Sequence, residues 1–393
     1  MFRIRIRRNL IYLIILYITY NVRTIISIII KRIFKLKAPY IFLFLMTLGQ
    51  LTGGLAIYIY QYINLSQKKE VKYFEINIIH NRKRKAKTDN IFKKLLLVIF
   101  SGFFDFIEYS IEIFYIPKIA DISPSIVPRL GCLSTIVSSL ICVSSLNFKI
   151  GRHQKFSLIF LSISFLITLL LEIITKTKGI ALENFIYVHV LVCLILILMP
   201  FNDCTERYLV FYNFINPFII LAGEGLFQII ISIFFSINKN PFNSLIKKYN
   251  EISTEEFALL VFLLFLYYFL SSIINVYKIY CNVIYNPMAR AFAKYFLNPF
   301  FNIYFYLEED DFHNNILYFI ICEIINIIID FFYFVYNEYI ILYCCGLEHD
   351  TYDEIFERAK YGAFGYLSFE SIDAVESDLG SSNGDKELNE IYD

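Results

Sequence analysis

Carboxylate side chains stand inside one of the apolar runs of this chain, where charged groups are rare. The run SGFFDFIEYSIEIFYIP, residues 101–117, contains Asp105, Glu108 and Glu112 at positions i, i+3 and i+7. This spacing predicts three carboxylates along one face of a helix. Ionisable groups in hydrocarbon are costly, and they normally face the interior of a bundle or an aqueous cavity. Such a face could pair with cations, bind an amine or exchange a proton.

Cations and a further carboxylate occupy comparable positions elsewhere. Arg129 follows two prolines at the start of an apolar run, and Arg290 and Lys294 lie one turn apart at the start of another. Glu224 lies between two glycines, which allow close approach of a second helix. Cationic residues of this kind suit an anionic solute or a phosphate group. The candidate binding residues are Arg129, Arg290, Lys294, Asp105, Glu108 and Glu224.

Two structural roles compete with a binding role for these residues. An arginine or lysine near a helix end can extend toward the lipid headgroups, which applies to Arg129 and Lys294. Asp105 and Glu108 can pair with such cations solely to hold a bundle together. Spacing alone leaves all three roles open.

The composition indicates a membrane protein. Of the 393 residues, 58% are hydrophobic and 18% are charged, whereas soluble domains have about 25% charged residues. The eight cysteines are spread over the apolar segments without the spacing of a disulfide framework or a metal site. We therefore expect the lipid bilayer as a partner, and neither a metal, a cofactor nor a nucleic acid.

Ten segments are long and apolar enough to cross a bilayer, and each is expected to be a helix because backbone groups in hydrocarbon must be satisfied within the segment. Their approximate ranges are 9–30, 40–63, 95–117, 126–146, 156–175, 185–201, 215–236, 257–281, 288–307 and 316–343. The predicted fold is all-α and polytopic.

Lysine and arginine in the loops predict the orientation. The stretch 64–94 and the stretch NFKIGRHQK are basic, whereas the stretch LEEDDFHNN contains neither lysine nor arginine. The positive-inside rule places the two basic loops and both termini in the cytoplasm. The basic stretch 31–37 disagrees, because it would lie on the opposite side. Nine spans, without the segment 9–30, are therefore the alternative.

Ten helices divide into two halves of five, residues 1–175 and 176–346. A proline followed closely by an arginine opens a helix in each half, in SIVPR and in YNPMAR. Transporters are often built from inverted repeats whose interrupted helices mark the substrate site. The pattern indicates two inverted halves. The acidic tail, 347–393, has the composition of a disordered cytoplasmic segment.

Several stretches resemble a known family. They are PYIFLFLMTLGQLTGGLAIYIY, Arg129, TERYLVFYNFINPFIILAGEGLFQ and the charged start of the segment 288–307. Together they resemble the drug/metabolite transporter superfamily, in particular the EamA-type solute carrier 35 branch of nucleotide-sugar-transporter-like proteins and its F-type members. The similarity spans about residues 10–345 and is most specific at Glu206-Arg207, Pro217 and Glu224-Gly225.

The resemblance implies a ten-helix carrier whose fourth and ninth helices line a central cavity, which would place Arg129, Arg290 and Lys294 on that cavity. Family members tend to have glycine where Gln228 stands and arginine where Lys294 stands. The segment 288–307 also has no nucleotide-sugar recognition signature. We therefore do not expect a nucleotide-sugar substrate.

The leading hypothesis is a secondary transporter that moves a small polar, anionic metabolite by alternating access. The alternative is a membrane scaffold that has a transporter-like fold without transport. An enzyme is not expected, because no nucleophile stands with a base at useful spacing and no Gly-rich phosphate loop follows a strand. An endomembrane such as the Golgi, a lysosome-like organelle or a vacuole is favoured over the plasma membrane, and a homodimer is an open alternative to a monomer.

Overall fold

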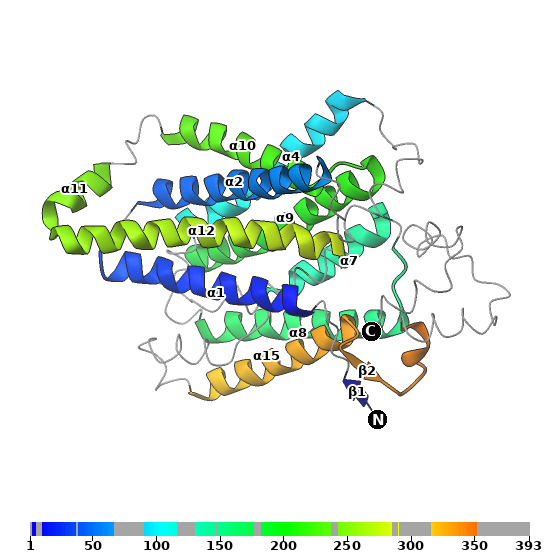
Figure 1. The fold of residues 1–393 in the computed structure, drawn as a ribbon. Coiled ribbons are helices and arrows are strands. Elements are labelled where there is room, and N and C mark those ends of the chain that lie inside the picture. Colours follow the sequence, from blue (N-terminus) through cyan, green and yellow to red (C-terminus); the bar gives the residue numbers. More distant parts are fainter. Residues whose placement is uncertain are drawn as a thin grey trace.

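The computed structural model of the chain describes residues 2–4, 10–36, 38–66, 90–115, 130–146, 148–176, 182–236, 243–284, 290 and 316–351. Almost all of this part is helical, and its long helices lie side by side in one bundle (Figure 1). Six helices are long and apolar enough to cross a membrane: α1 (Leu10–Arg32), α2 (Pro39–Ser66), α8 (Arg152–Lys176), α9 (Leu182–Asn213), α10 (Pro217–Ser236) and α12 (Thr254–Ile284). The chain is therefore an all-α integral membrane protein, as predicted.

Three more helices belong to the same bundle, namely α4 (Ile91–Phe114), α7 (Cys132–Leu146) and α15 (Ile316–Tyr336). Helix α4 begins where the side chain of Asn90 accepts a hydrogen bond from the backbone N–H of Phe92 at 2.9 Å, which caps an otherwise unpaired donor. The short helix α11 (Asn243–Glu251) precedes α12. Two strands, β1 (Phe2–Ile4) and β2 (Ile340–Leu342), and the 3-10 turn η3 (Glu348–Asp350) complete the described part.

Helix α2 packs against both α10 and α12, and α4 packs against α9 and α10. Small residues allow the α2–α10 crossing. A Cβ atom on Gly225 would lie 2.5 Å from the backbone nitrogen of Leu51, and one on Gly54 would lie 2.7 Å from that of Ala222. The two backbones therefore touch, as small residues permit in membrane helices. On the other sides of the bundle, α1 packs on α12, and α8 packs on α15.

The beginning of the chain and the segment after α15 meet at one end of the bundle. Strand β1 pairs antiparallel with β2, so that Phe2 lies opposite Leu342 (Figure 1). The start of α8 is held there too, because the backbone N–H of Arg152 donates to Asp350 Oδ2 at 3.0 Å.

The flanks of the long basic stretch are tied to the same end. Lys94, at the start of α4, donates to the carbonyl oxygen of Asn213 at 3.2 Å. The hydroxyl of Tyr212 donates to the carbonyl oxygen of Leu146, at the end of α7, and α8 begins six residues later. The described flanks of both predicted basic loops thus lie at the end of the bundle that carries β1 and β2.

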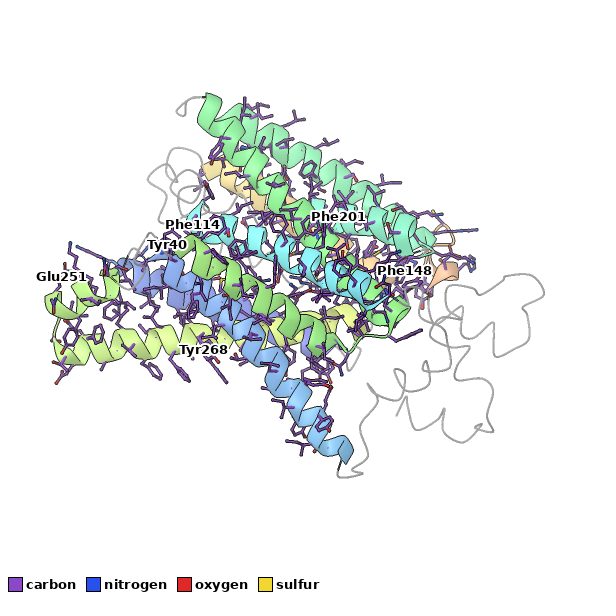
Figure 2. All side chains as sticks on the ribbon, turned by 90° about the horizontal axis from the view of Figure 1, so that it is seen from above. Tyr40, Phe114, Phe148, Phe201, Glu251 and Tyr268 are labelled. Atoms are coloured by element: carbon purple, nitrogen blue, oxygen red, sulfur yellow. The ribbon has the colours of Figure 1, made fainter. Side chains whose placement is uncertain are left out.

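The opposite end holds the turn between α1 and α2. There Tyr40 and Phe114 stack edge to face with ring centroids 4.9 Å apart, which joins the start of α2 to the end of α4 (Figure 2). The basic stretch 31–37 belongs to this end. This end is opposite to the end that carries β1 and β2, so the stretch 31–36 lies away from the described flanks of the two basic loops.

Two predicted boundaries are wrong. The segment 185–201 was expected to end before a polar run, but α9 continues through that run to Asn213 because its polar side chains are buried inside the bundle. The segment 316–343 ends earlier, at Tyr336, because Glu338 adopts a left-handed backbone with φ of 59° and the chain then turns into β2. The predicted segment 288–307, apart from Arg290, and the tail beyond residue 351 lie outside the described residues.

Candidate functional site

The carboxylates of α4 meet cations from other helices. Asp105 and Glu108 are buried, with exposed fractions of 0% and 1%. Lys278 Nζ of α12 lies 2.7 Å from Asp105 Oδ1, and Arg23 of α1 lies 3.3 Å from Glu112 Oε1. The predicted acidic face therefore contacts at least two cations that come from different helices.

Lys278 is the ammonium group at the centre of the bundle. Its Nζ lies 3.2 Å from Glu206 Oε1 of α9 in addition to its contact with Asp105, and its side chain is 1% exposed. An isolated ammonium in a dry interior is very costly, so two carboxylates around one lysine compensate its charge. Lys278 thereby joins α12 to α4 and to α9.

Helix α9 presents its polar residues to this centre just after Pro200, which cannot donate a hydrogen bond to the preceding turn. Asn202 Nδ2 donates to Asp105 Oδ1 at 3.0 Å and to Glu206 Oε1 at 3.2 Å. Asn282 Nδ2 of α12 donates to the second oxygen of Glu206 at 2.9 Å. Both carboxylates are thus held by an amide as well as by Lys278.

Glu224 of α10 approaches the same centre from the other side. Its Oε2 accepts a hydrogen bond from Gln50 Nε2 of α2 at 3.0 Å, and its Oε1 contacts the hydroxyl of Ser101 of α4. The hydroxyl of Ser101 also contacts Asn202 Oδ1. The approach is possible because Gly102 leaves room: a Cβ atom there would lie 3.1 Å from the Cα atom of Glu224.

These side chains form one continuous network, which we call the polar core. Its members come from α2, α4, α9, α10 and α12, and all of them are buried. They are Gln50, Ser101, Asp105, Asn202, Glu206, Glu224, Gln228, Lys278 and Asn282. Three carboxylates in this set face a single ammonium group.

Two arginines flank the polar core. Arg290 is 1% exposed and forms an ion pair with Asp203, and Asp105 and Glu108 are its electrostatic neighbours. Arg207 lies over the rings of Phe148 and Phe211, at 5.0 and 4.6 Å from their centroids, which is the geometry of a cation–π contact. Both guanidinium groups are therefore engaged inside the bundle.

The structure brings Asp105 and Glu224 into one network and places Glu108 and Arg290 beside it. Arg129 and Lys294 lie outside the described residues. The cationic cavity expected from Arg129, Arg290 and Lys294 is therefore represented in the structure by Arg290 alone, and this arginine is buried against Asp203.

Sequence reasoning missed the central cation and most of its partners. Lys278 was available as a single lysine inside the apolar run SSIINVYKIYCNVI. The sequence marks Glu206 only through the family resemblance, because the helix predicted over 185–201 ends before this residue. Gln50, Ser101 and Asn202 carry no charge, and polar uncharged residues inside a span give only a weak signal.

Among the described residues, no group of three or more His, Cys, Asp or Glu side chains is placed to hold a metal ion. All eight cysteines are free thiols. Neither protein-family models nor curated proteins match the chain.

Proposed function

We propose that the chain is a secondary solute carrier that works by alternating access, with the polar core between two inverted halves. The observation that carries the proposal is the excess of buried carboxylates over cations at a point where helices of both halves meet. A buried ion pair contributes little net stability, because desolvation offsets most of its Coulomb energy. A functional role is therefore the first hypothesis for ionisable residues inside the membrane.

Support for two halves comes from the pattern of helix packing. Suppose that each helix of the first half is replaced by its counterpart in the second half, and the reverse: α1 by α9, α2 by α10, α4 by α12 and α8 by α15. The contact of α1 with α12 then becomes a contact of α9 with α4, and the structure contains both. The packing of α2 on α12 becomes that of α10 on α4 in the same way, and the pairs α2–α10 and α8–α15 map onto themselves.

The directions of the helices agree with an inverted relation. At the end of the bundle that carries β1 and β2, α2 ends and α10 begins, while α8 begins and α15 ends (Figure 1). The ten-helix count remains part of this proposal, in which α7 and the segment 288–307 are the fourth members of the two halves. Inverted repeats place substrate and coupling-ion sites at the repeat interface.

Helix α7 offers polar groups that suit a solute or water. The hydroxyls of Ser134 and Thr135 are buried, and they have no hydrogen-bond partner among the described residues. A buried polar group without a partner costs free energy. The anionic character of the solute stays a prediction from Arg129 and Lys294, and the endomembrane location also stays a prediction.

The test is uptake of a panel of labelled metabolites into proteoliposomes, with the Lys278→Ala variant as the probe of the polar core. We expect saturable uptake of at least one metabolite by the parent and a loss of at least tenfold in the variant. Lys247→Ala is the matched control, because Lys247 lies on α11 with 78% of its side chain exposed. Equal uptake by folded parent and Lys278→Ala protein would contradict the proposed site.

A membrane scaffold is the second candidate, and the pairing of the described cations favours it. Lys278 contacts two carboxylates, Arg290 contacts Asp203, and Arg23 contacts Glu112. A scaffold uses such pairs only for assembly. If no metabolite of the panel enters proteoliposomes that contain folded parent protein, the scaffold is the better account.

A further inference from the structure

The contacts of Ser101 require one more hydrogen atom than its hydroxyl has. Its oxygen lies in hydrogen-bond contact with Asn202 Oδ1 and with Glu224 Oε1. A serine hydroxyl donates a single hydrogen, and an amide oxygen has none to give. The second hydrogen must therefore come from Glu224.

The orientation of Asn202 is fixed by its other contacts. Its Nδ2 atom lies within 3.2 Å of both Asp105 Oδ1 and Glu206 Oε1. A flipped amide would place its oxygen against two carboxylate oxygens, with no hydrogen between the amide oxygen and either of them. The amide oxygen of Asn202 therefore faces Ser101 and accepts from it, so Glu224 donates to Ser101.

We propose that Glu224 is a protonated carboxylic acid in this conformation and is the proton-binding residue that couples solute movement to a proton gradient. The coupling rests on the carrier proposed above, whereas the protonation stands on the hydrogen bonds alone. Asp105, which the sequence suggested for this role, is instead a permanently ionised partner of Lys278.

The surroundings of the two carboxylates explain the difference. Asp105 accepts from the Lys278 ammonium at 2.7 Å, from Asn202 and from Gln228 Nε2 at 3.3 Å. Glu224 has no cation in hydrogen-bond contact among the described residues, and the amide of Gln50 and the hydroxyl of Ser101 are neutral. A carboxylate with a cationic donor keeps its charge, whereas a desolvated one without such a donor retains its proton.

Each helix packed on α10 contributes a definite group to the surroundings of Glu224. Helix α2 presents the neutral Gln50, α4 presents Asp105, α9 presents Glu206 and α12 presents Lys278. An ionised Glu224 would be a third carboxylate beside one ammonium group. Proton binding removes that surplus charge.

Loss of the proton from Glu224 redirects the hydroxyl hydrogen of Ser101 from Asn202 to Glu224. When Glu224 gives its proton to water on the side to which the core has opened, the hydroxyl of Ser101 turns and donates to the new carboxylate. Asn202 Oδ1 then loses its donor, and the amide that holds Asp105 and Glu206 is less restrained. Ser101 is thus a positioning residue that links the proton site to Lys278, and proton uptake from the opposite side reverses these steps.

The corresponding position of the first half shows what a proton-independent version of the site contains. The pair Gly49-Gln50 of α2 matches Gly223-Glu224 of α10, and the side chains of Gln50 and Glu224 are hydrogen bonded to each other. Glutamine is the neutral isostere of a protonated glutamate. Glu224→Gln therefore makes the two positions alike and removes the exchangeable proton.

Infrared difference spectroscopy of the full-length protein in lipid nanodiscs tests the protonation without any solute. We expect a carbonyl band of a buried carboxylic acid at neutral pH, lost in Glu224→Gln and shifted in Ser101→Ala, which retains the acid but removes its acceptor. Glu112→Gln is the control that leaves the band in place. Absence of the band in the parent, its persistence in Glu224→Gln, or an unshifted band in Ser101→Ala would overturn the assignment.

Uptake of the same metabolite panel under an imposed pH gradient tests the coupling. We expect the parent to accumulate solute at least tenfold more with the gradient than without it, and the uptake by Glu224→Gln, at whatever level it retains, to be the same with and without the gradient. Gradient-independent uptake by the parent would overturn the coupling while leaving the infrared assignment intact. A parent without any uptake would contradict the carrier itself, and the infrared result would still decide the protonation.

Discussion

Asp105 and Glu224 are two fully buried carboxylates of one network, and they are stabilised in opposite ways. Asp105 accepts from an ammonium group and two amides, whereas Glu224 has an amide and a hydroxyl in contact. The same type of group can therefore be a fixed charge or a neutral acid within one membrane interior. The neighbours decide which, and burial alone does not.

The largest effect on stability is expected when Asp105, the ionised carboxylate of the two, loses its cation. Lys278→Ala leaves Asp105 and Glu206 as buried carboxylates without their shared ammonium, and we expect it to lower the free energy of unfolding by about 3–5 kcal/mol. Equilibrium unfolding in mixed micelles measures this, with exposed Lys247→Ala as the control. A loss no larger than that of the control would mean that Lys278 does not compensate these carboxylates.

A smaller effect separates donors to an ion from donors to a neutral acid. Asn202→Leu removes two hydrogen bonds to ionised carboxylates, so we expect a loss of about 3 kcal/mol, whereas Gln50→Leu removes one bond to a neutral acid and should cost about 1 kcal/mol. The same unfolding assay gives both numbers. If Gln50→Leu proves the more damaging variant, Glu224 must carry a charge.

The helix crossing beneath Glu224 offers a third test. A Cβ atom on Gly225 would lie 2.5 Å from the backbone nitrogen of Leu51, which cannot move aside, so we expect Gly225→Ala to destabilise the protein by about 2 kcal/mol. Gly223→Ala is the matched control, because its Cβ atom would meet only a side-chain methyl of Val98, at 3.0 Å. Equal thermal stability of the two variants would show that the α2–α10 crossing is not tight.

The smallest effect is expected at a carboxylate outside the membrane. The Lys248 ammonium donates to Glu251 Oε2 at 2.8 Å and lowers the pKa of this exposed carboxyl. A lowered folded-state pKa stabilises the protein above the ordinary pKa of about 4.3, and this contribution disappears as the pH falls through the folded value.

For Glu251→Gln we therefore expect a slight loss of thermal stability at neutral pH that vanishes in acid, because solvent screens an exposed pair. Melting curves at several pH values measure the difference between variant and parent. A loss of stability as large as that of Lys278→Ala would contradict the expectation that an exposed ion pair contributes less than a buried one.

Hydrophobic run length was enough to find the six long apolar helices, because crossing a bilayer sets a minimum length and an apolar composition for each segment. The acidic face of α4 was also predictable, since three charges at helical spacing share a side. The end of α9 was predicted too early because a polar run looks like a loop. Asn202 and Glu206 can be buried in a helix only because α4 and α12 supply their hydrogen-bond partners. Lys278 is easy to see as a single cation in an apolar run. Its importance was missed because the two carboxylates that compensate its charge come from distant segments of the chain.

The pairing of β1 with β2 sets a condition on how the chain is made. Residues 2–4 are synthesised before α1, and their partners, residues 340–342, follow at least 336 residues later. At about 5–20 residues per second, roughly 17 to 67 seconds pass between the two events. The opening strand must therefore stay unpaired, with its edge exposed to other chains, until the last described helix has been inserted. The pairing of β1 with β2 is therefore a late step of biosynthesis that follows the synthesis of α15, and a fusion placed ahead of residue 2 would lie next to the strand that this step needs.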